Sequence, residues 1–227
     1  MPKIPIARLG NRSGPLLMED TNKAKVDEHI NRALDQDGFY HLKSCVNHAL
    51  INAIKLDFVR VLSQYSKRRL ALPTSPNEID SILDNLFAEI TEKSTKIREN
   101  AYKVFAENIK IINIANQKKI NNLLRQLGLI VPTLCSFNVL AMEPDRKRFL
   151  FHPHQDLHRH ISHKTINIWV PLTTGKNIGG MGIAKGAHAD GPLPHFVASD
   201  GQLEIKRSLY EHREHVLFED IDVGDAI

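Results

Sequence analysis

The hydrophobic pattern of this chain changes near Gly128, and that change limits the folds available to it. Before this point, apolar residues recur three and four positions apart, which predicts amphipathic helices. After it, apolar runs are short, rich in β-branched and aromatic residues, and separated by turns, which predicts strands. We therefore expect an α+β protein, helical over about residues 20–128 and β-rich over about 129–227.

Five helices are expected in the first half. The apolar faces of the first four begin at Val26, Leu50, Ile79 and Ile97, and the fifth helix falls on NQKKINNLLRQLG. The fourth apolar face continues through Phe105 to Ile109, one turn later. Gly128 should end the fifth helix, because glycine readily adopts the left-handed conformation that closes many helices.

The second half should contain several short strands around one core. The stretches with strand character are LIVPTLCSFNVLAME, RFLFHPHQD, TINIWVPLT, MGIAK and EHVLFED. Short strands at this spacing are typical of a β-barrel or jelly roll. Because 227 residues suit one domain, we expect residues 1–227 to form a single unit in which a helical layer packs on a β-core.

Charge, cysteine content and the lack of long apolar runs indicate which partners and which cellular compartment to expect. The net charge is only +4, and the basic clusters SKRRL and DRKRF are short, so we expect no nucleic-acid groove. Two cysteines fit a reducing compartment, and we expect a cytoplasmic protein. The N-terminus lacks an apolar secretory segment, and no apolar run is long enough to span a bilayer, so we expect no membrane partner.

The stretch HPHQDLHRHISH, residues 152–163, is the strongest candidate for a metal site. It contains five of the twelve histidines and one carboxylate, Asp156. On a strand, residues two apart point the same way, so any two neighbours among the even-numbered residues could bind one metal. Spacing alone does not choose between them.

Four interpretations of this stretch stay open on spacing. A dinuclear zinc hydrolase motif, H-x-H-x-D-H, has Leu157 in place of its last histidine. A cupin-type site would use His152 and His154, but no glutamate follows within the stretch. The pair His154 and Asp156 fits an H-x-D motif, which with a distant histidine forms the facial triad of non-haem Fe(II) enzymes. The fourth interpretation is a solvated turn that binds no metal.

An ordered set of motifs resembles the phytanoyl-CoA dioxygenase family of Fe(II)/2-oxoglutarate-dependent oxygenases. The set is HPHQDLH, INIWVPLT, GGMGIAKGAH and FEDIDVGDAI, and the similarity is good over about residues 129–227 and looser over about 26–62. The resemblance implies a double-stranded β-helix (jelly-roll) core. It also implies Fe(II), 2-oxoglutarate and O₂, and a dioxygenase that hydroxylates an unactivated C–H bond of a small-molecule or acyl substrate.

The resemblance also assigns roles to individual residues. It makes His154 and Asp156 metal ligands and places Trp169 beside the 2-oxoglutarate. His158 is the best of the neighbouring histidines for contact with substrate or support of a ligand, whereas His188 matches a turn histidine that is usually structural.

The last motif stops earlier than the resemblance leads us to expect. In the family, a second iron-binding histidine and a 2-oxoglutarate-binding Arg or Lys follow the G-D strand, whereas this sequence ends at VGDAI. We expect the sequence to be part of a longer protein, because a core strand cut short leaves a sheet edge unpaired and a barrel open. The alternatives are a non-catalytic jelly-roll binding protein without a full metal triad and, third, a zinc hydrolase.

Overall fold

The computed structural model describes residues 28–66, 73, 75–129, 131–134, 137–140, 151–156, 165–173, 180–199, 201–218 and 221–227. Over these residues the protein combines α-helices with small antiparallel sheets, which confirms the expected α+β class. The helices are α1 (Glu28–Gln36), α2 (His48–Ser66), α3 (Pro76–Lys93), α4 (Thr95–Ala106), α5 (Ile109–Ala115) and α6 (Lys118–Gln126).

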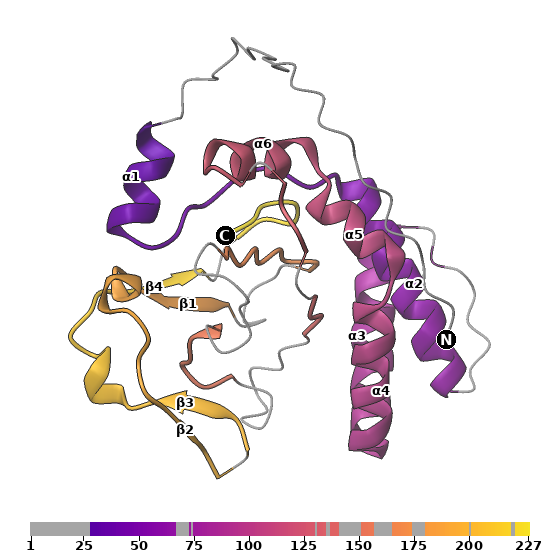
Figure 1. Cartoon of the computed structure of the whole chain (residues 1–227). Helices are drawn as coiled ribbons and strands as arrows, with labels where there is room; N and C mark the ends of the chain where they lie inside the picture. The colour runs from indigo at the N-terminus through magenta and orange to yellow at the C-terminus, as the bar shows by residue number, and fades with distance from the viewer. Residues whose placement is uncertain are drawn as a thin grey trace, which may run out of the picture.

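The strands among the described residues form two antiparallel pairs. These are β1 (Met181–Ala184) with β4 (His215–Phe218), and β2 (His195–Val197) with β3 (Leu203–Ile205). Two short 3₁₀ helices, η3 (Ala187–Asp190) and η4 (Arg207–Leu209), lie between strands. Helices α2 to α5 gather on one side of the molecule and both strand pairs lie on the other (Figure 1).

The junction between α4 and α5 differs from the prediction. Asn108 has extended backbone, and its side-chain oxygen accepts a hydrogen bond from the Lys110 N–H at 2.8 Å, which caps a new helix. Ile109 is therefore the first residue of α5, and it is 76% exposed. Its predicted place on the apolar face of the fourth helix is wrong, because the asparagine cap starts a separate helix there.

Gly128 closes the last helix of the first half, as predicted. Its φ is +82°, and its N–H donates to the Arg125 carbonyl at 3.0 Å. The Leu129 N–H donates to the Leu124 carbonyl at 2.9 Å. This pair of bonds is the Schellman closure, which satisfies carbonyls that the end of α6 would otherwise leave without partners.

The strand predictions are confirmed only in part. MGIAK and EHVLFED contain β1 and β4, which pair in register from Met181↔Phe218 to Ala184↔His215. The β2–β3 hairpin was not predicted. The described parts of LIVPTLCSFNVLAME, RFLFHPHQD and TINIWVPLT are not strands, although Trp169 and Ile227 exchange main-chain hydrogen bonds of 2.9 and 3.0 Å.

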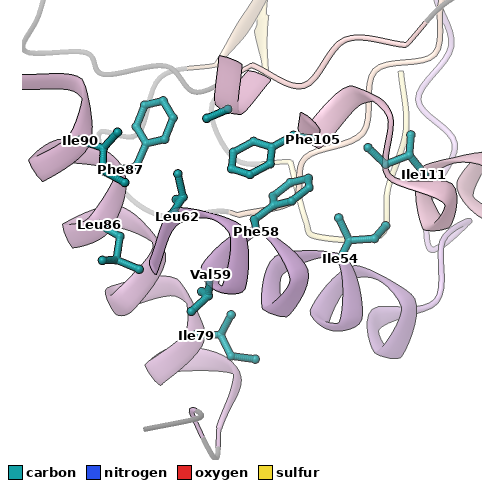
Figure 2. Close-up of a cluster of buried hydrophobic side chains, with 11 residues drawn as sticks. Ile54, Phe58, Val59, Leu62, Ile79, Leu86, Phe87, Ile90, Phe105 and Ile111 are labelled. Carbon is teal, nitrogen blue, oxygen red and sulfur yellow. The ribbon is translucent and has the colours of Figure 1, made fainter. Parts of the chain in front are cut away.

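The larger core cluster holds the helices together. Phe58 of α2 and Phe105 of α4 stack with their ring centroids 4.0 Å apart (Figure 2). Around them lie buried aliphatic and aromatic side chains from α2, α3, α4 and α5: Ile54, Val59, Leu62, Ile79, Leu86, Phe87, Ile90, Ala101 and Ile111. Burial of the larger of these apolar side chains, at about 1.5–3 kcal/mol each, is the main force that joins the helices.

A second cluster connects the helical half to the C-terminal residues. Ile51 of α2 and Ile120 and Leu124 of α6 pack with Val46 and Ala226. Ala226 also exchanges main-chain hydrogen bonds of 2.8 and 2.9 Å with Leu42. Residues from both halves of the sequence therefore pack in one buried cluster.

Candidate metal-binding site

The segment 151–156 carries the predicted ligands and lies along the β2–β3 hairpin. The Pro153 carbonyl accepts a hydrogen bond from the Ile205 N–H at 2.8 Å. One residue earlier, His152 Nδ1 lies 3.8 Å from a carboxylate oxygen of Glu204. These contacts attach the irregular segment 151–156 to the regular β2–β3 hairpin, so the hairpin helps to fix the position of the segment.

The imidazole of His154 is oriented by its own segment. Its Nδ1 lies 2.6 Å from the main-chain carbonyl of His152. Because a carbonyl only accepts, Nδ1 is the ring nitrogen that carries the proton in this bond, and Nε2 is the basic nitrogen of the neutral ring. Metal-binding histidines commonly show this arrangement, with the distal N–H held by a carbonyl and the other nitrogen directed at the metal.

Asp156 faces the same point as His154. Its Oδ1 lies 3.5 Å from His154 Nε2, and its Oδ2 accepts a hydrogen bond from the Asn167 side-chain amide at 3.0 Å. The side chains of His154 and Asp156 are 32% and 43% exposed, so a small ion can reach both. The structure thus brings these two predicted residues together and adds Asn167, which orients the carboxylate.

The donor pair suits two positions of a divalent metal centre. Neighbouring ligands of an octahedral ion, each about 2.1 Å from the metal, lie about 3 Å apart, close to the separation of these two atoms. One imidazole with one carboxylate is two-thirds of the 2-His-1-carboxylate set. Over the part of the chain that the structure describes, no group of three His, Cys, Asp or Glu residues is arranged to hold a metal ion.

The other residues singled out from the sequence lie in different surroundings. Trp169 is half-buried and lies two residues after Asn167. The segment that carries Trp169 therefore contacts the candidate pair through the hydrogen bond from Asn167 to Asp156. His158 lies outside the described residues. His188 lies at the C-terminal end of α1, with its Nε2 3.1 Å from the Asp35 carbonyl and its ring beside Gly38.

Three neighbours of the pair were not singled out from the sequence. Asn167 carries a weak signal, because it alternates with Trp169 in a stretch of strand character. Gln155 stands inside the H-x-D motif and forms hydrogen bonds to a turn about 36 residues away. His195 accepts a hydrogen bond from the Gln155 N–H across 40 residues, and no local pattern could have indicated it.

Comparisons with known proteins found no matching family model, no matching curated protein and no matching solved structure for this chain. Among the described helices, none is both long and apolar enough to cross a membrane. The residues of the site and the sequence motifs therefore carry the evidence for function.

Proposed function

We propose that the protein is a non-haem Fe(II)/2-oxoglutarate-dependent dioxygenase that hydroxylates an unactivated C–H bond of a small-molecule or acyl substrate. The observation that carries the proposal is the approach of His154 Nε2 to Asp156 Oδ1 at 3.5 Å. On each of these side chains a second polar atom is held by a hydrogen bond, from His154 Nδ1 to His152 and from Asn167 to Asp156 Oδ2. Such bonds fix ligand direction before a metal arrives.

The proposal includes a jelly-roll core built around the C-terminal residues. Main-chain bonds join Leu42 to Ala226 and Ile227 to Trp169, so three segments distant in sequence run side by side. Such long-range antiparallel neighbours are typical of jelly rolls. This arrangement supports a β-core between the helical layer and the candidate pair.

In this proposal His154 and Asp156 hold Fe(II), which when bound would supply the sites at which 2-oxoglutarate and O₂ react. The protein's part is orientation and charge, because the Asp156 carboxylate offsets part of the ion's charge and Asn167 keeps that carboxylate turned toward His154. Trp169 is proposed to lie against the 2-oxoglutarate, and His158 to contact substrate. We place the protein in the cytoplasm, without nucleic-acid or membrane partners.

Metal binding is the first test. The purified protein should bind Fe(II), or Co(II) as an air-stable probe, with one equivalent per chain in calorimetric titration. His154→Ala and Asp156→Ala should each abolish binding, because each removes one of the two ligands identified among the described residues. His152→Ala is the matched control, since it removes a neighbouring imidazole and leaves intact the main-chain carbonyl that holds His154. Loss of binding in His152→Ala but not in Asp156→Ala would favour the cupin-type H-x-H site instead.

Turnover is the second test. With Fe(II) and ascorbate, the protein as its gene encodes it should convert 2-oxoglutarate to succinate, and Asp156→Ala should not. A protein that binds neither metal nor 2-oxoglutarate and forms no succinate with acyl, amino-acid or sugar substrates is the non-catalytic binding protein. Preference for Zn²⁺, with hydrolysis that needs no 2-oxoglutarate, would favour the zinc hydrolase.

A further inference from the structure

A closed set of hydrogen bonds holds Gln155, the residue that stands between the two candidate ligands. We propose that Gln155 and His195 are positioning residues that set the directions of the His154 and Asp156 side chains. The inference rests on the proposed metal role of that pair. Gln155 and His195 contact each other and Leu193 although the segments that carry them are about 40 residues apart in the sequence.

The side chain of Gln155 is held at both of its polar atoms. Its amide nitrogen donates to the Gly191 carbonyl at 3.1 Å, and its amide oxygen accepts from the Leu193 N–H at 2.8 Å. Only a side chain that both donates and accepts at this reach can make the two bonds. Gln155 stands between the two candidate ligands, so fixing it restricts the backbone on which both are carried.

His195 holds the main chain at the same position. Its Nε2 accepts a hydrogen bond from the Gln155 N–H at 2.9 Å, and its Nδ1 lies 2.9 Å from the Leu193 carbonyl. Because Nε2 accepts, Nδ1 must carry the proton and donate to Leu193. The neutral tautomer is therefore defined by its two partners.

The three residues form a ring of hydrogen bonds. The Gln155 N–H donates to His195, His195 donates to the Leu193 carbonyl, and the Leu193 N–H donates to the Gln155 amide oxygen. Every link joins a donor to an acceptor, so no member can turn without breaking a bond. The ring of hydrogen bonds joins Gln155 to His195, the first residue of β2. A strand holds a side chain more rigidly than the irregular segment 151–156 does.

The first measurement is independent of metal. In the metal-free full chain at about pH 8, ring ¹⁵N spectra should show His154 as a single tautomer protonated at Nδ1. Gln155→Leu and His195→Phe should replace this with averaged ring signals, because the segment loses its support. His195→Gln should restore the wild-type His154 spectrum, since a glutamine oxygen can accept from the Gln155 N–H near the place of Nε2. Val197→Ala, on the same strand and 67% exposed, is the matched control.

The second measurement is Co(II) affinity. Gln155→Leu and His195→Phe should weaken binding about 10–100-fold, the usual effect of losing a residue that orients a metal ligand, and His195→Gln should recover most of it. Gln155→Glu, which keeps the acceptor and loses the donor to Gly191, should lie between wild type and Gln155→Leu. Circular dichroism shows which variants fold. If Gln155→Leu or His195→Phe unfolds the chain, Gln155→Glu and His195→Gln are measured in its place.

The outcomes separate the two proposals. A wild-type protein that binds no Co(II) contradicts the proposed function, whereas the His154 ring spectra still decide the positioning role. Wild-type His154 spectra in folded Gln155 and His195 variants would overturn the positioning role, as would unchanged Co(II) affinity in a binding-competent protein. Reduced stability with unchanged spectra and affinity would show that the ring of bonds is structural only.

Discussion

The imidazole of His41 hydrogen-bonds to the carboxylate of Asp225 at 2.7 Å, which joins residues 184 positions apart. The other carboxylate oxygen accepts from the Ser44 N–H at 2.7 Å, and Asp225 is only 4% exposed. These bonds flank the main-chain pairing of Leu42 with Ala226, so they secure the contact between the start of the helical half and the C-terminal residues.

Stability should depend on the charge of Asp225. Burial raises the pKa of this carboxyl, but the hydrogen bonds from Ser44 and His41 outweigh burial and hold the pKa below its ordinary value of 3.8. A carboxyl with a depressed folded-state pKa stabilises above the unfolded-state pKa, and this contribution is lost as pH falls through the folded-state pKa. Asp225→Asn should therefore lower the free energy of unfolding by about 1–3 kcal/mol at pH 7.

The pH dependence of that difference is the measurement. Urea unfolding of wild type and Asp225→Asn should show the full gap at pH 7 and a shrinking gap below about pH 4, where the wild-type carboxyl takes up a proton. A gap of constant size down to pH 2 would mean that the charge of Asp225 contributes nothing.

Gly224 should tolerate no side chain. Its φ is +93°, and a Cβ there would lie 2.7 Å from the Val46 carbonyl oxygen. Gly224→Ala should cost about 3 kcal/mol or more, because left-handed strain of about 1–2 kcal/mol adds to a main-chain clash. Gly201→Ala is the control, since Gly201 has φ +83° with nothing within 4 Å of the added Cβ, and it should lose only the strain energy. Equal losses in thermal unfolding of the two variants would refute the clash.

The ion pair between α2 and α3 should respond unequally to removal of its two members. Lys55 is 2% exposed, and its Nζ lies 2.6 Å from Asp80, whose side chain is 31% exposed. Asp80→Ala should cost about 3 kcal/mol, because it leaves a buried ammonium without this partner. Lys55→Met should cost about 1 kcal/mol or less, since Asp80 can then hydrate. Chemical unfolding should also show the double variant to be more stable than Asp80→Ala; the reverse order would contradict the asymmetry.

The bond from Asn167 to Asp156 should matter for metal affinity. Asn167→Ala removes the amide that holds Asp156 Oδ2 and should weaken Co(II) binding about 10-fold, because the carboxylate can then rotate away from His154. Ile166→Ala changes the preceding exposed side chain and should leave affinity unaltered. Indistinguishable titrations of all three proteins would remove Asn167 from the site.

Local sequence patterns were sufficient for most of the helical half. The apolar periodicity predicts helices because burial of one helix face depends on residues three and four apart in the same segment. Gly128 ends α6 as expected, since the left-handed closure is a property of that residue and its immediate neighbours. The junction at Asn108 was missed although its cap is also local, because the apolar spacing from Phe105 to Ile109 continues across it.

The sequence by itself determined the α+β class, the helical first half and the strands β1 and β4, all of which depend on residues near one another in the chain. The pair His154 and Asp156 was selected by the resemblance of several ordered motifs, because their spacing alone left other pairs open. Tertiary structure alone decided which groups surround that pair. Asn167 reaches Asp156 across 11 residues and His195 reaches Gln155 across 40. Strand pairing and side-chain hydrogen bonds between residues far apart in the sequence depend on which surfaces pack together. The periodicity of one segment does not indicate which other segment will lie against it.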